Sequence, residues 1–341
     1  MVKLGIIGCG YWGSNLIRAF SQQEGMDLWG VSDADHQKGA ILNARYPRCR
    51  YFNQYSDMLK QDVDAVVIAT DSGTHYQIAK DVLKAGKDVM IEKPMSLTSR
   101  DCEELIELAE KKKRILMVGH TFMYNAAVRK LKEYISQGEL GEVYYLYSAR
   151  LNLGKVRRDV NALWNFAPHD VSIILYLLDK EPLEVNARGF SYLQRGIEDV
   201  VFVTLTFNGG ISAHIHISWL DPNKIRRMTV VGNRKMVVYD DMSSDHKIQI
   251  FDKGITRNNV SSSLEHYSNF GKFQLIHRAG DLWIPRIDFP EPLKVECRHF
   301  LDCVITRKRP LSDGYNGLRV VRILEAAQES MTDSGHAVEV K

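Results

Sequence analysis

The sequence predicts a two-domain α/β protein, in which a doubly wound parallel sheet is followed by an α/β domain with a large, mainly antiparallel open sheet. Short apolar runs alternate with helical patterns over the first 120 residues, and longer strands of alternating character fill residues 143–252. Continuous apolar strands are typical of parallel sheets covered on both faces, and alternating strands of antiparallel sheets with one freer face. We therefore expect a first domain over residues 1–120 and a second over residues 121–341.

Composition limits the classes of function. The 341 residues carry 45 basic and 42 acidic side chains, a net charge of +3, so we expect neither a nucleic-acid nor a membrane partner. The basic cluster at 111–114 follows an acidic helical stretch and is interpreted as a solvated helix C-terminus. Five scattered cysteines without a CxxC predict neither disulfides nor zinc. No signal peptide or membrane-length apolar run is expected, which favours a cytoplasmic protein.

A glycine-rich turn opens the chain. The apolar strand at 2–7 leads into Gly8, Gly10 and Gly13, which fit GxGxxG, and a helical pattern follows. Gly8 would allow the tight turn, Gly10 the approach of a pyrophosphate, and Gly13 the close packing of helix on strand. Phosphates bind well at such a helix N-terminus, where free N–H groups point outward. We expect Tyr11 and Trp12, which lie in the same turn, to contact the cofactor too.

An acidic residue completes this pattern. A second strand at 28–32 ends in Asp33, twenty residues after Gly13, where a carboxylate accepts the two hydroxyls of an adenosine ribose. Asp33 would repel the 2′-phosphate of NADP, and Arg45 and Arg48 lie too far along the chain to replace it. The order of strand, glycines, helix, strand and acid predicts a Rossmann domain that binds NAD; a purely structural glycine turn is the alternative.

The alternation continues with strands at 64–70, 88–92 and 115–118 and helices at 74–85 and 99–113. Ligands of an open parallel sheet bind at the carboxyl ends of its strands. Seven polar residues fall at such ends: Thr70, Ser72, Thr74, His75, Glu92, Lys93 and His120. We expect His120 to contact the substrate and the other six to contact the cofactor.

The second half has a different character. Strands are expected at 143–150, 200–207, 211–220, 228–231, 236–239 and 247–252, with a hairpin over 231–236. Helices are expected at 128–136, 170–178, 295–306 and 318–331, the last of them packing back on the first domain. Polar stretches near Ser244 and over 257–273 predict loops.

Three motifs carry a family resemblance: GCGYWG at 8–13, Glu92-Lys93-Pro94, and NFAPHD at 165–170. Together they resemble the Gfo/Idh/MocA oxidoreductases, over the whole chain. GHTFMYNAAVRKL, LWNFAPHD and HIHISWLDP narrow the resemblance to a subgroup of nucleotide-sugar 3-dehydrogenases, the UDP-N-acetylglucosamine type. The resemblance implies hydride transfer between NAD and a sugar or cyclitol carbon, and a homodimer or homotetramer built on the open sheet.

The resemblance also implies roles for two residues. Lys93 would contact the substrate hydroxyl and the nicotinamide ribose, where a desolvated ammonium can join a proton relay; the alternative is an ion pair with Glu92. His169 would exchange the substrate proton. The family pattern is DxxxH, but this chain has Asn165 at the acid position, and an amide orients a hydroxyl without taking its proton. Lys93 and His169 would then carry the acid–base chemistry, and Asp170 is expected to cap a helix.

The predicted substrate-binding residues are Asn165, Asn161, Trp164, His120, Tyr124 and Arg157. Arg157 would suit the diphosphate of a nucleotide sugar, with a solvated loop as the alternative. His214 and His216 share one strand face but have no acidic or cysteine partner nearby, so they are interpreted as a polar sheet face or subunit contact, and no metal site is predicted.

The leading hypothesis is an NAD-dependent enzyme that oxidises C3 of a nucleotide-linked sugar. One alternative is a dehydrogenase or ketoreductase of a free sugar or an inositol. Another is a catalytically silent NAD-binding regulator, against which the presence of both Lys93 and His169 argues.

Overall fold

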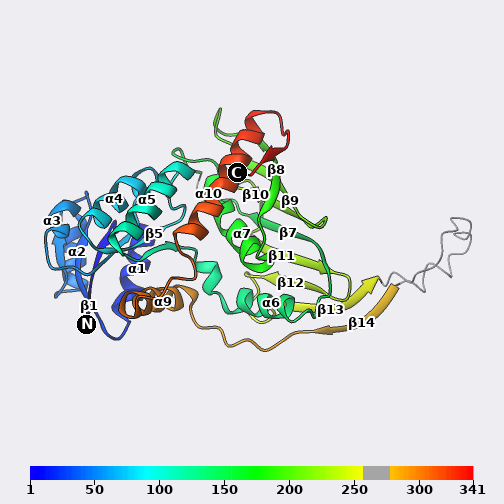
Figure 1. Ribbon diagram of the computed structural model, residues 1–341, viewed down its shortest axis with the longest axis horizontal. Coiled ribbons are helices and arrows are strands. Elements are labelled where there is room, and N and C mark those ends of the chain that lie inside the picture. Colours follow the sequence, from blue (N-terminus) through cyan, green and yellow to red (C-terminus); the bar gives the residue numbers. More distant parts are fainter. Residues whose placement is uncertain (155, 256–276, 341) are drawn as a thin grey trace, which may run out of the picture. The chain divides into compact units, whose positions relative to one another are not determined.

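The computed structural model describes residues 1–154, 156–255 and 277–340, and the loop expected over 257–273 lies outside them. The chain divides into two compact units (Figure 1), residues 1–125 with 290–325 and residues 126–289 with 326–341. The segment 290–325, which we expected in the second domain, belongs to the first unit because helix α9 (Pro292–Thr306) packs against α1 (Tyr11–Ser21).

The first unit is built on a parallel sheet of six strands in the order β3-β2-β1-β4-β5-β6. The strands are β1 Val2–Ile7, β2 Met26–Ser32, β3 Arg50–Phe52, β4 Ala65–Ile68, β5 Asp88–Glu92 and β6 Leu116–Gly119. This order reverses beside β1, and ligands of such sheets bind at the carboxyl ends of the strands near that point. The predicted doubly wound parallel sheet is confirmed.

Helices cover both faces of this sheet. They are α1, α2 Lys38–Arg45, α3 Tyr55–Leu59, α4 His75–Lys84, α5 Ser99–Lys112, α9 and the first part of α10 (Gly314–Thr332), with short 3₁₀ turns at Ser72–Thr74 and Thr121–Tyr124. Figure 1 shows α4 and α5 on one face and α1 and α9 on the other. α2, β3 and α3 were not predicted from the sequence; all three are short, and only Gly39, Leu42 and Met58 in them are buried. All residues of β4 and β5 are buried, as continuous apolar runs predict.

The second unit is built on a nine-stranded sheet in the order β14-β13-β12-β11-β7-β10-β9-β8-β15, in which only β7 and β10 pair in parallel. The strands are β7 Val143–Leu151, β8 Pro182–Phe190, β9 Val200–Phe207, β10 Ser212–Ser218, β11 Ile225–Gly232, β12 Met236–Asp240, β13 Ile248–Ile255, β14 His277–Trp283 and β15 Val338–Glu339. The expected mainly antiparallel sheet and the hairpin that pairs Val231 with Met236 are confirmed.

Two helices, α6 (Ala126–Ser136) and α7 (Ala162–Leu178), cover one face of this sheet. The prediction that the second of these begins near Asp170 is wrong, because α7 begins eight residues earlier. Asn161 caps it by accepting a hydrogen bond from the Trp164 N–H at 3.2 Å. Pro168 lies inside α7 rather than before it, where it removes one backbone hydrogen bond without ending the helix.

The opposite face carries aromatic and polar side chains. Tyr145, Tyr147 and Phe202 are each at least 40% exposed. The ring of His216 stacks on Phe202 with centroids 4.4 Å apart, and His214 Nδ1 lies 3.0 Å from the Thr204 hydroxyl. Within the described part of the chain, no group of three potential ligands could hold a metal ion.

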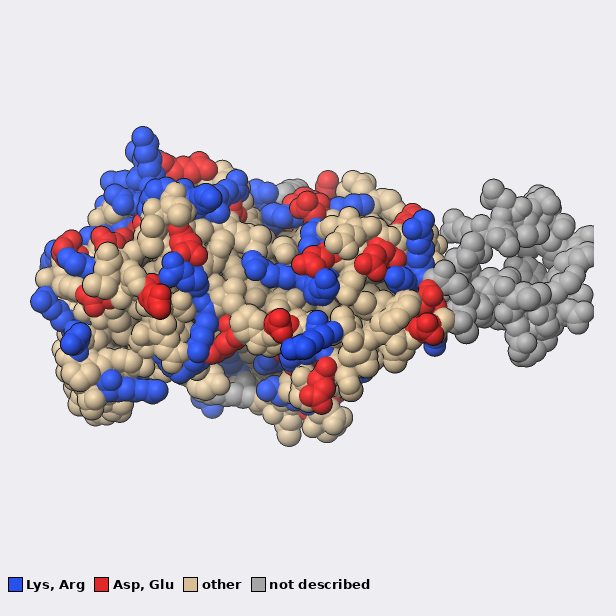
Figure 2. Space-filling view, turned by 90° about the horizontal axis from the view of Figure 1, so that it is seen from below, with Lys and Arg blue, Asp and Glu red and all other residues tan. Residues whose placement is uncertain are grey.

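The described helices include none that combines the length and apolar character of a membrane span. Lys and Arg side chains are interspersed with Asp and Glu on the face shown in Figure 2. This mixture agrees with the small net charge of the whole chain, +3.

Asp170 is not a helix cap but half of a buried ion pair. Its carboxylate accepts hydrogen bonds from Arg150 Nε at 2.6 Å, Arg150 Nη2 at 3.3 Å and the Ser148 hydroxyl at 2.6 Å. Both charged side chains are almost fully buried. The pair joins the middle of α7 to the central strand β7, so it fixes the helix on the sheet.

We predict that Asp170→Asn lowers the free energy of unfolding by about 3–5 kcal/mol, because it leaves the buried Arg150 guanidinium without a countercharge. Denaturant unfolding followed by far-UV circular dichroism measures the loss. Asp179→Asn is the matched control: Asp179 is exposed in a left-handed conformation that asparagine adopts readily, so its stability should change little. A similar loss in both variants would contradict the assigned role of the pair.

Candidate active site

The turn between β1 and α1 has the shape that a bound pyrophosphate requires. Gly8 has φ +92°, and a Cβ there would lie 2.6 Å from the Ala69 carbonyl oxygen. A Cβ at Gly13 would lie 2.0 Å from the Gly8 carbonyl oxygen, whereas one at Gly10 would meet no atom within 4 Å. Gly10 precedes α1 without a capping side chain, so the first N–H groups of the helix are available to an anion.

Asp33 follows β2 beside this turn. Its carboxylate accepts hydrogen bonds from the N–H groups of Cys9 at 2.7 Å and Asp35 at 2.9 Å, and it pairs with Lys38 Nζ at 3.0 Å. Partial burial raises the pKa of Asp33, but these hydrogen bonds outweigh burial and the pKa is lowered below its ordinary value. Sequence reasoning missed Lys38, although a lysine five residues after the acid, at the start of α2, was the available signal.

These features fit a dinucleotide. The side-chain-free turn and the open N-terminus of α1 suit the pyrophosphate, and the ionised carboxylate of Asp33 suits the ribose hydroxyls. Tyr11 is 88% exposed and Trp12 38% exposed in the same turn. Both side chains are therefore accessible to a ligand, which their predicted contact with the cofactor requires.

Glu92 ends β5 as a buried carboxyl group. Its Oε1 accepts a hydrogen bond from Trp12 Nε1 at 2.6 Å, and its Oε2 accepts one from the Lys93 N–H at 3.3 Å. A Cβ at Gly119, the last residue of β6, would lie 2.8 Å from Glu92 Oε1, so glycine makes room for the carboxyl group. Burial raises the pKa of Glu92 to about 7, against the hydrogen bond from Trp12 and the charge of Lys93, which both lower it.

Two further buried groups belong to the same region. Glu296 on α9 is fully buried and accepts a hydrogen bond from the Thr121 hydroxyl at 2.8 Å. Burial and then the charge of Glu92 raise the pKa of Glu296 well above its ordinary value, which favours its protonated, neutral form. His120 is 1% exposed, and in the part of the chain that the structure describes neither ring nitrogen has a hydrogen-bond partner. Burial and the charge of Lys93 lower the pKa of His120 to about 3, so its ring is neutral.

Lys93 is half-buried directly after Glu92, and the peptide bond between Lys93 and Pro94 is cis. His75 braces this turn, because its Nδ1 lies 2.8 Å from the Pro94 carbonyl oxygen and its Nε2 lies 3.1 Å from that of Thr70. The ring is fully buried, and burial lowers the pKa of His75. We therefore interpret His75 as a support of the site; its predicted contact with the cofactor stays a prediction.

The remaining predicted residues of the first unit lie in two settings. The hydroxyls of Thr70 and Thr74 are 2.8 Å apart, and the half-buried Ser72 lies in the turn between them. Tyr124 is instead buried, with its hydroxyl 2.9 Å from that of Ser312. We interpret Tyr124 as a core residue, although its predicted substrate contact is not tested.

In the second unit, α7 carries two of the predicted substrate residues, Trp164 and Asn165, together with His169. Asn165 and His169 lie four positions apart, so they share one face of the helix, and both are half-buried, as is Trp164. Asn161 is engaged as the helix cap and donates to Glu198 Oε2 at 2.6 Å and Gln328 Oε1 at 2.9 Å. Arg157 is bound by the Asp159 carboxylate, with Nε 2.9 Å from Oδ1.

Each unit thus brings part of the predicted set together. At the carboxyl ends of the parallel strands, Trp12, Glu92 and His120 gather around the charge of Lys93. Glu296 is the member that sequence reasoning missed, because a glutamate in an amphipathic helix 200 residues further along carries no signal of burial.

Comparisons with known proteins agree with this geometry. Residues 2–120 match the model of an oxidoreductase family with an NAD-binding Rossmann fold, and residues 128–238 match the Gfo/Idh/MocA C-terminal domain. The chain belongs to the Gfo/Idh/MocA oxidoreductase family. It is therefore an NAD-binding oxidoreductase, as the residues around Gly8 and Asp33 predicted.

Several members of the family are similar over most of their length. UDP-N-acetylglucosamine 3-dehydrogenase from Acidithiobacillus ferrooxidans is 29% identical over 257 residues, which cover 74% of this chain and 78% of the relative. Inositol 2-dehydrogenase 2 from Saccharopolyspora erythraea is 27% identical over 224 residues, covering 63% and 66%.

Solved structures share the fold. The structure of the same Acidithiobacillus ferrooxidans dehydrogenase, GnnA, superposes with a TM-score of 0.81 at 24% identity and covers 97% of each chain. The structure of GenD2 from gentamicin A biosynthesis, in complex with NAD, superposes with a TM-score of 0.83 at 22% identity, covering all of this chain and 96% of the other.

We predict that two opposite charges tune the choice of cofactor. Asp33→Ala should weaken NAD binding and narrow its advantage over NADP, because it removes the ribose acceptor and frees Lys38 for the 2′-phosphate. Lys38→Gln should widen the advantage of NAD about ten-fold, since a charged hydrogen bond to the phosphate is lost. Titrations with both cofactors measure the ratio, with Lys38→Arg as the control that keeps the charge. A wild type that prefers NADP would refute the assignment of Asp33.

A second prediction concerns Glu92 and Trp12. Because the pKa of Glu92 is raised to about 7, the carboxyl group is neutral below that pH and negatively charged above it. The Trp12 indole donates to this group, so its fluorescence should change through a midpoint near pH 7. Glu92→Gln should abolish the transition, and Trp12→Phe should remove the emission that reports it. An unchanged transition in Glu92→Gln would assign it to another group.

Proposed function

We propose that this enzyme oxidises the C3 hydroxyl of a nucleotide-linked sugar of the UDP-N-acetylglucosamine type. The observation that carries the proposal is its similarity to UDP-N-acetylglucosamine 3-dehydrogenase in sequence, over 74% of the chain, and in fold, over 97%. The secondary alcohol becomes a ketone as its carbon loses a hydride and its oxygen loses a proton. When bound, NAD⁺ supplies the hydride acceptor for this reaction.

The chain's own residues would handle the proton. In this proposal the Lys93 ammonium donates a hydrogen bond to the substrate oxygen and belongs to a proton relay with Glu92, whose pKa of about 7 lets it exchange a proton near neutral pH, while His169 receives the proton of the hydroxyl. His120 stays neutral and offers its buried ring nitrogens as hydrogen-bond partners for a polar ligand atom.

The face of α7 would supply the remaining groups. His169 exchanges the proton and Asn165, one turn earlier on that face, orients the sugar through its amide. Asn161 contributes indirectly, because it caps the helix that carries both residues. Trp164 offers an aromatic surface beside them, and Arg157, held by Asp159, remains the proposed contact for a diphosphate.

A second candidate is the oxidation of an inositol. Inositol 2-dehydrogenases are nearly as similar to this chain, at 26–27% identity over 224 residues. The two candidates are separated by a reduced-nicotinamide absorbance assay with UDP-sugars, free sugars and inositols. Turnover with UDP-N-acetylglucosamine and none with inositols supports the proposal, and the reverse preference refutes it. Turnover with no compound would favour a catalytically silent NAD-binding protein.

We also propose that the enzyme is a homodimer or homotetramer joined through the open sheet face. Tyr145 and Tyr147 on β7 and Phe202 on β9 lie exposed on that face, on the two strands that flank β10, and large aromatic side chains are enriched where proteins associate. Light scattering of the wild type measures the mass in solution. Phe202→Glu should shift it to the monomer, and a monomeric wild type would refute the interface.

We predict that His169→Ala lowers kcat by about 10²- to 10⁴-fold, the usual contribution of a positioned acid or base. Asn165→Ala should raise KM and lower kcat together through misplacement of the sugar, and Asn165→Asp should be tolerated. The pH dependence of kcat/KM for these variants separates the two roles. If His169→Ala kept both its rate and the wild-type pH profile, His169 would be structural.

A further inference from the structure

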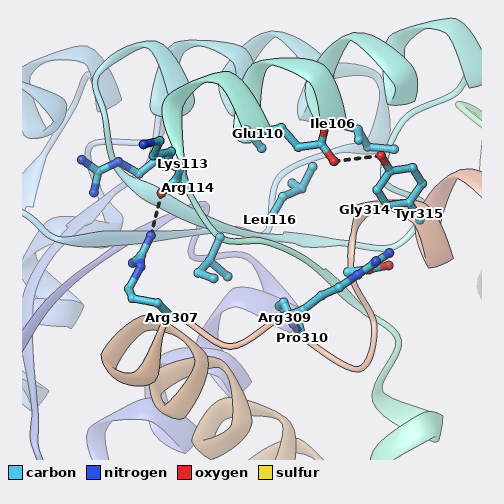
Figure 3. Close-up of a pocket in the computed structure, with 13 residues that line it drawn as sticks. Ile106, Glu110, Lys113, Arg114, Leu116, Arg307, Arg309, Pro310, Gly314 and Tyr315 are labelled. Carbon is cyan, nitrogen blue, oxygen red and sulfur yellow. Dashed lines mark hydrogen bonds and ion pairs between the residues drawn. The ribbon is translucent and has the colours of Figure 1, made fainter.

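Two basic segments that are far apart in the sequence meet at one pocket of the first unit. Lys113 and Arg114 follow α5, and Arg307 and Arg309 follow α9. The four line a pocket of about 570 Å³ (Figure 3), a volume in the range that small-molecule sites occupy. Residues 111–114 do lie at the C-terminal end of a helix, as the sequence predicted, but the pocket that Lys113 and Arg114 line was not predicted.

The pocket lies beside the amino-terminal end of β6, whereas the cofactor site lies at the carboxyl ends of the strands. Ile115 and Leu116, at the start of β6, form part of its wall, whereas Gly119 and His120 lie at the carboxyl end of that strand. A ligand here would therefore bind apart from the NAD site, on the same sheet.

Its walls combine an apolar surface with an aromatic ring. Ile106, Ala109, Leu116 and Pro310 contribute aliphatic surface between the basic groups. The ring of Tyr315 is 44% exposed, and its hydroxyl donates to Glu110 Oε1 at 2.8 Å, as Figure 3 shows. Such a surface favours a ligand with a planar or apolar body rather than a bare ion.

The four cations are not equally available. Arg307 is occupied by Asp88, at 2.6 and 3.0 Å, and by the Lys113 carbonyl oxygen at 2.8 Å. Arg309 pairs with Asp313 through Nε, and its guanidinium lies over one side of the Tyr315 ring, with Cζ 4.9 Å from the ring centroid. Among the residues described, no carboxylate forms an ion pair with Lys113 or Arg114.

The basic groups are held on a firm support. Next to Arg309, the segment around Ser312 pairs with β6: the Val118 N–H donates to the Ser312 carbonyl oxygen at 2.7 Å, and the Ser312 hydroxyl donates to the Val118 carbonyl oxygen at 2.7 Å. Lys113 ends α5 in a left-handed conformation, and its carbonyl oxygen is bound by Arg307. The backbone that carries the basic side chains is thus fixed before a ligand arrives, which lowers part of the entropic cost of binding.

We propose that this pocket binds a small organic phosphate with a planar or apolar body, of the size of a nucleoside monophosphate. Lys113, Arg114 and the guanidinium of Arg309 bind the phosphate oxygens, because ammonium and guanidinium groups form strong charge-assisted hydrogen bonds with them. The body lies against Leu116 and Tyr315. The proposal does not depend on which sugar the enzyme oxidises.

The test is calorimetric titration of AMP into the full chain saturated with NAD, which keeps the adenosine site of the cofactor filled. We expect one AMP per chain, with adenosine and inorganic phosphate at least ten-fold weaker. Hexyl phosphate distinguishes the source of the affinity: binding like that of AMP assigns it to phosphate plus apolar surface, and much weaker binding assigns it to a planar base on Tyr315.

Substitutions at the pocket give the decisive comparison. Lys113→Gly removes one free cation without strain, since the residue has φ +53° and glycine adopts that conformation readily. Arg114→Gln removes the other, and each should weaken AMP binding about ten-fold. Lys112→Gln and Lys308→Gln are matched controls, because they change the same charge in the same two segments outside the pocket lining.

Three results would overturn the proposal: no AMP binding to the NAD-saturated protein, equal binding of adenosine or inorganic phosphate, or equal weakening by Lys112→Gln and Lys113→Gly. Asp33→Ala supplies a further check, because AMP binding that weakens with this variant belongs to the cofactor site.

Discussion

Burial of the Glu92 carboxyl group is the constraint on which the candidate site of the first unit depends. An isolated carboxylate is too costly to bury, so the surrounding structure must supply donors, space or a proton. Trp12 supplies a donor from α1, Gly119 supplies space on β6, and Lys93 supplies a positive charge from the next residue. One buried group therefore couples the glycine turn, the end of β5 and the end of β6. It also gives the site a group that exchanges its proton near neutral pH.

The same physics orients the helix that carries the other candidate residues. Asp170 is buried in the middle of α7, and its pairing with Arg150 and Ser148 fixes one face of the helix against β7. Asn165 and His169 lie on a less buried face of the same helix, so the ion pair determines indirectly where they point. Each unit therefore has a buried acid that positions the residues of the proposed chemistry. Asp170 takes no part in that chemistry, and Glu92 takes only an auxiliary part.

Charge is distributed differently at the carboxyl ends and at the amino ends of the parallel strands. At the carboxyl ends, Asp33 is ionised and partly balanced by Lys38, an arrangement suited to neutral hydroxyls rather than to a second phosphate. At the amino ends, Asp88 and Asp313 balance two arginines and leave Lys113 and Arg114 for an anion. Helix ends contribute to both, because α1 presents free N–H groups at the carboxyl ends and α5 delivers lysine and arginine to the amino ends.

Local patterns in the sequence predict the parallel strands β1, β2 and β4–β6, the glycine turn, an acid at Asp33 directly after β2, and the change to an antiparallel sheet. Apolar runs and glycine spacings are properties of neighbouring residues, so they are visible without the fold. The start of α7 depends on the tertiary structure, because a buried helix tolerates Pro168. The tertiary structure also pairs Asp170 with Arg150, so Asp170 does not cap a helix. The fold also decided the partners of Glu92, Asp33 and Arg307. Burial and ion pairing depend on groups brought together from distant parts of the chain, and no local pattern records that proximity.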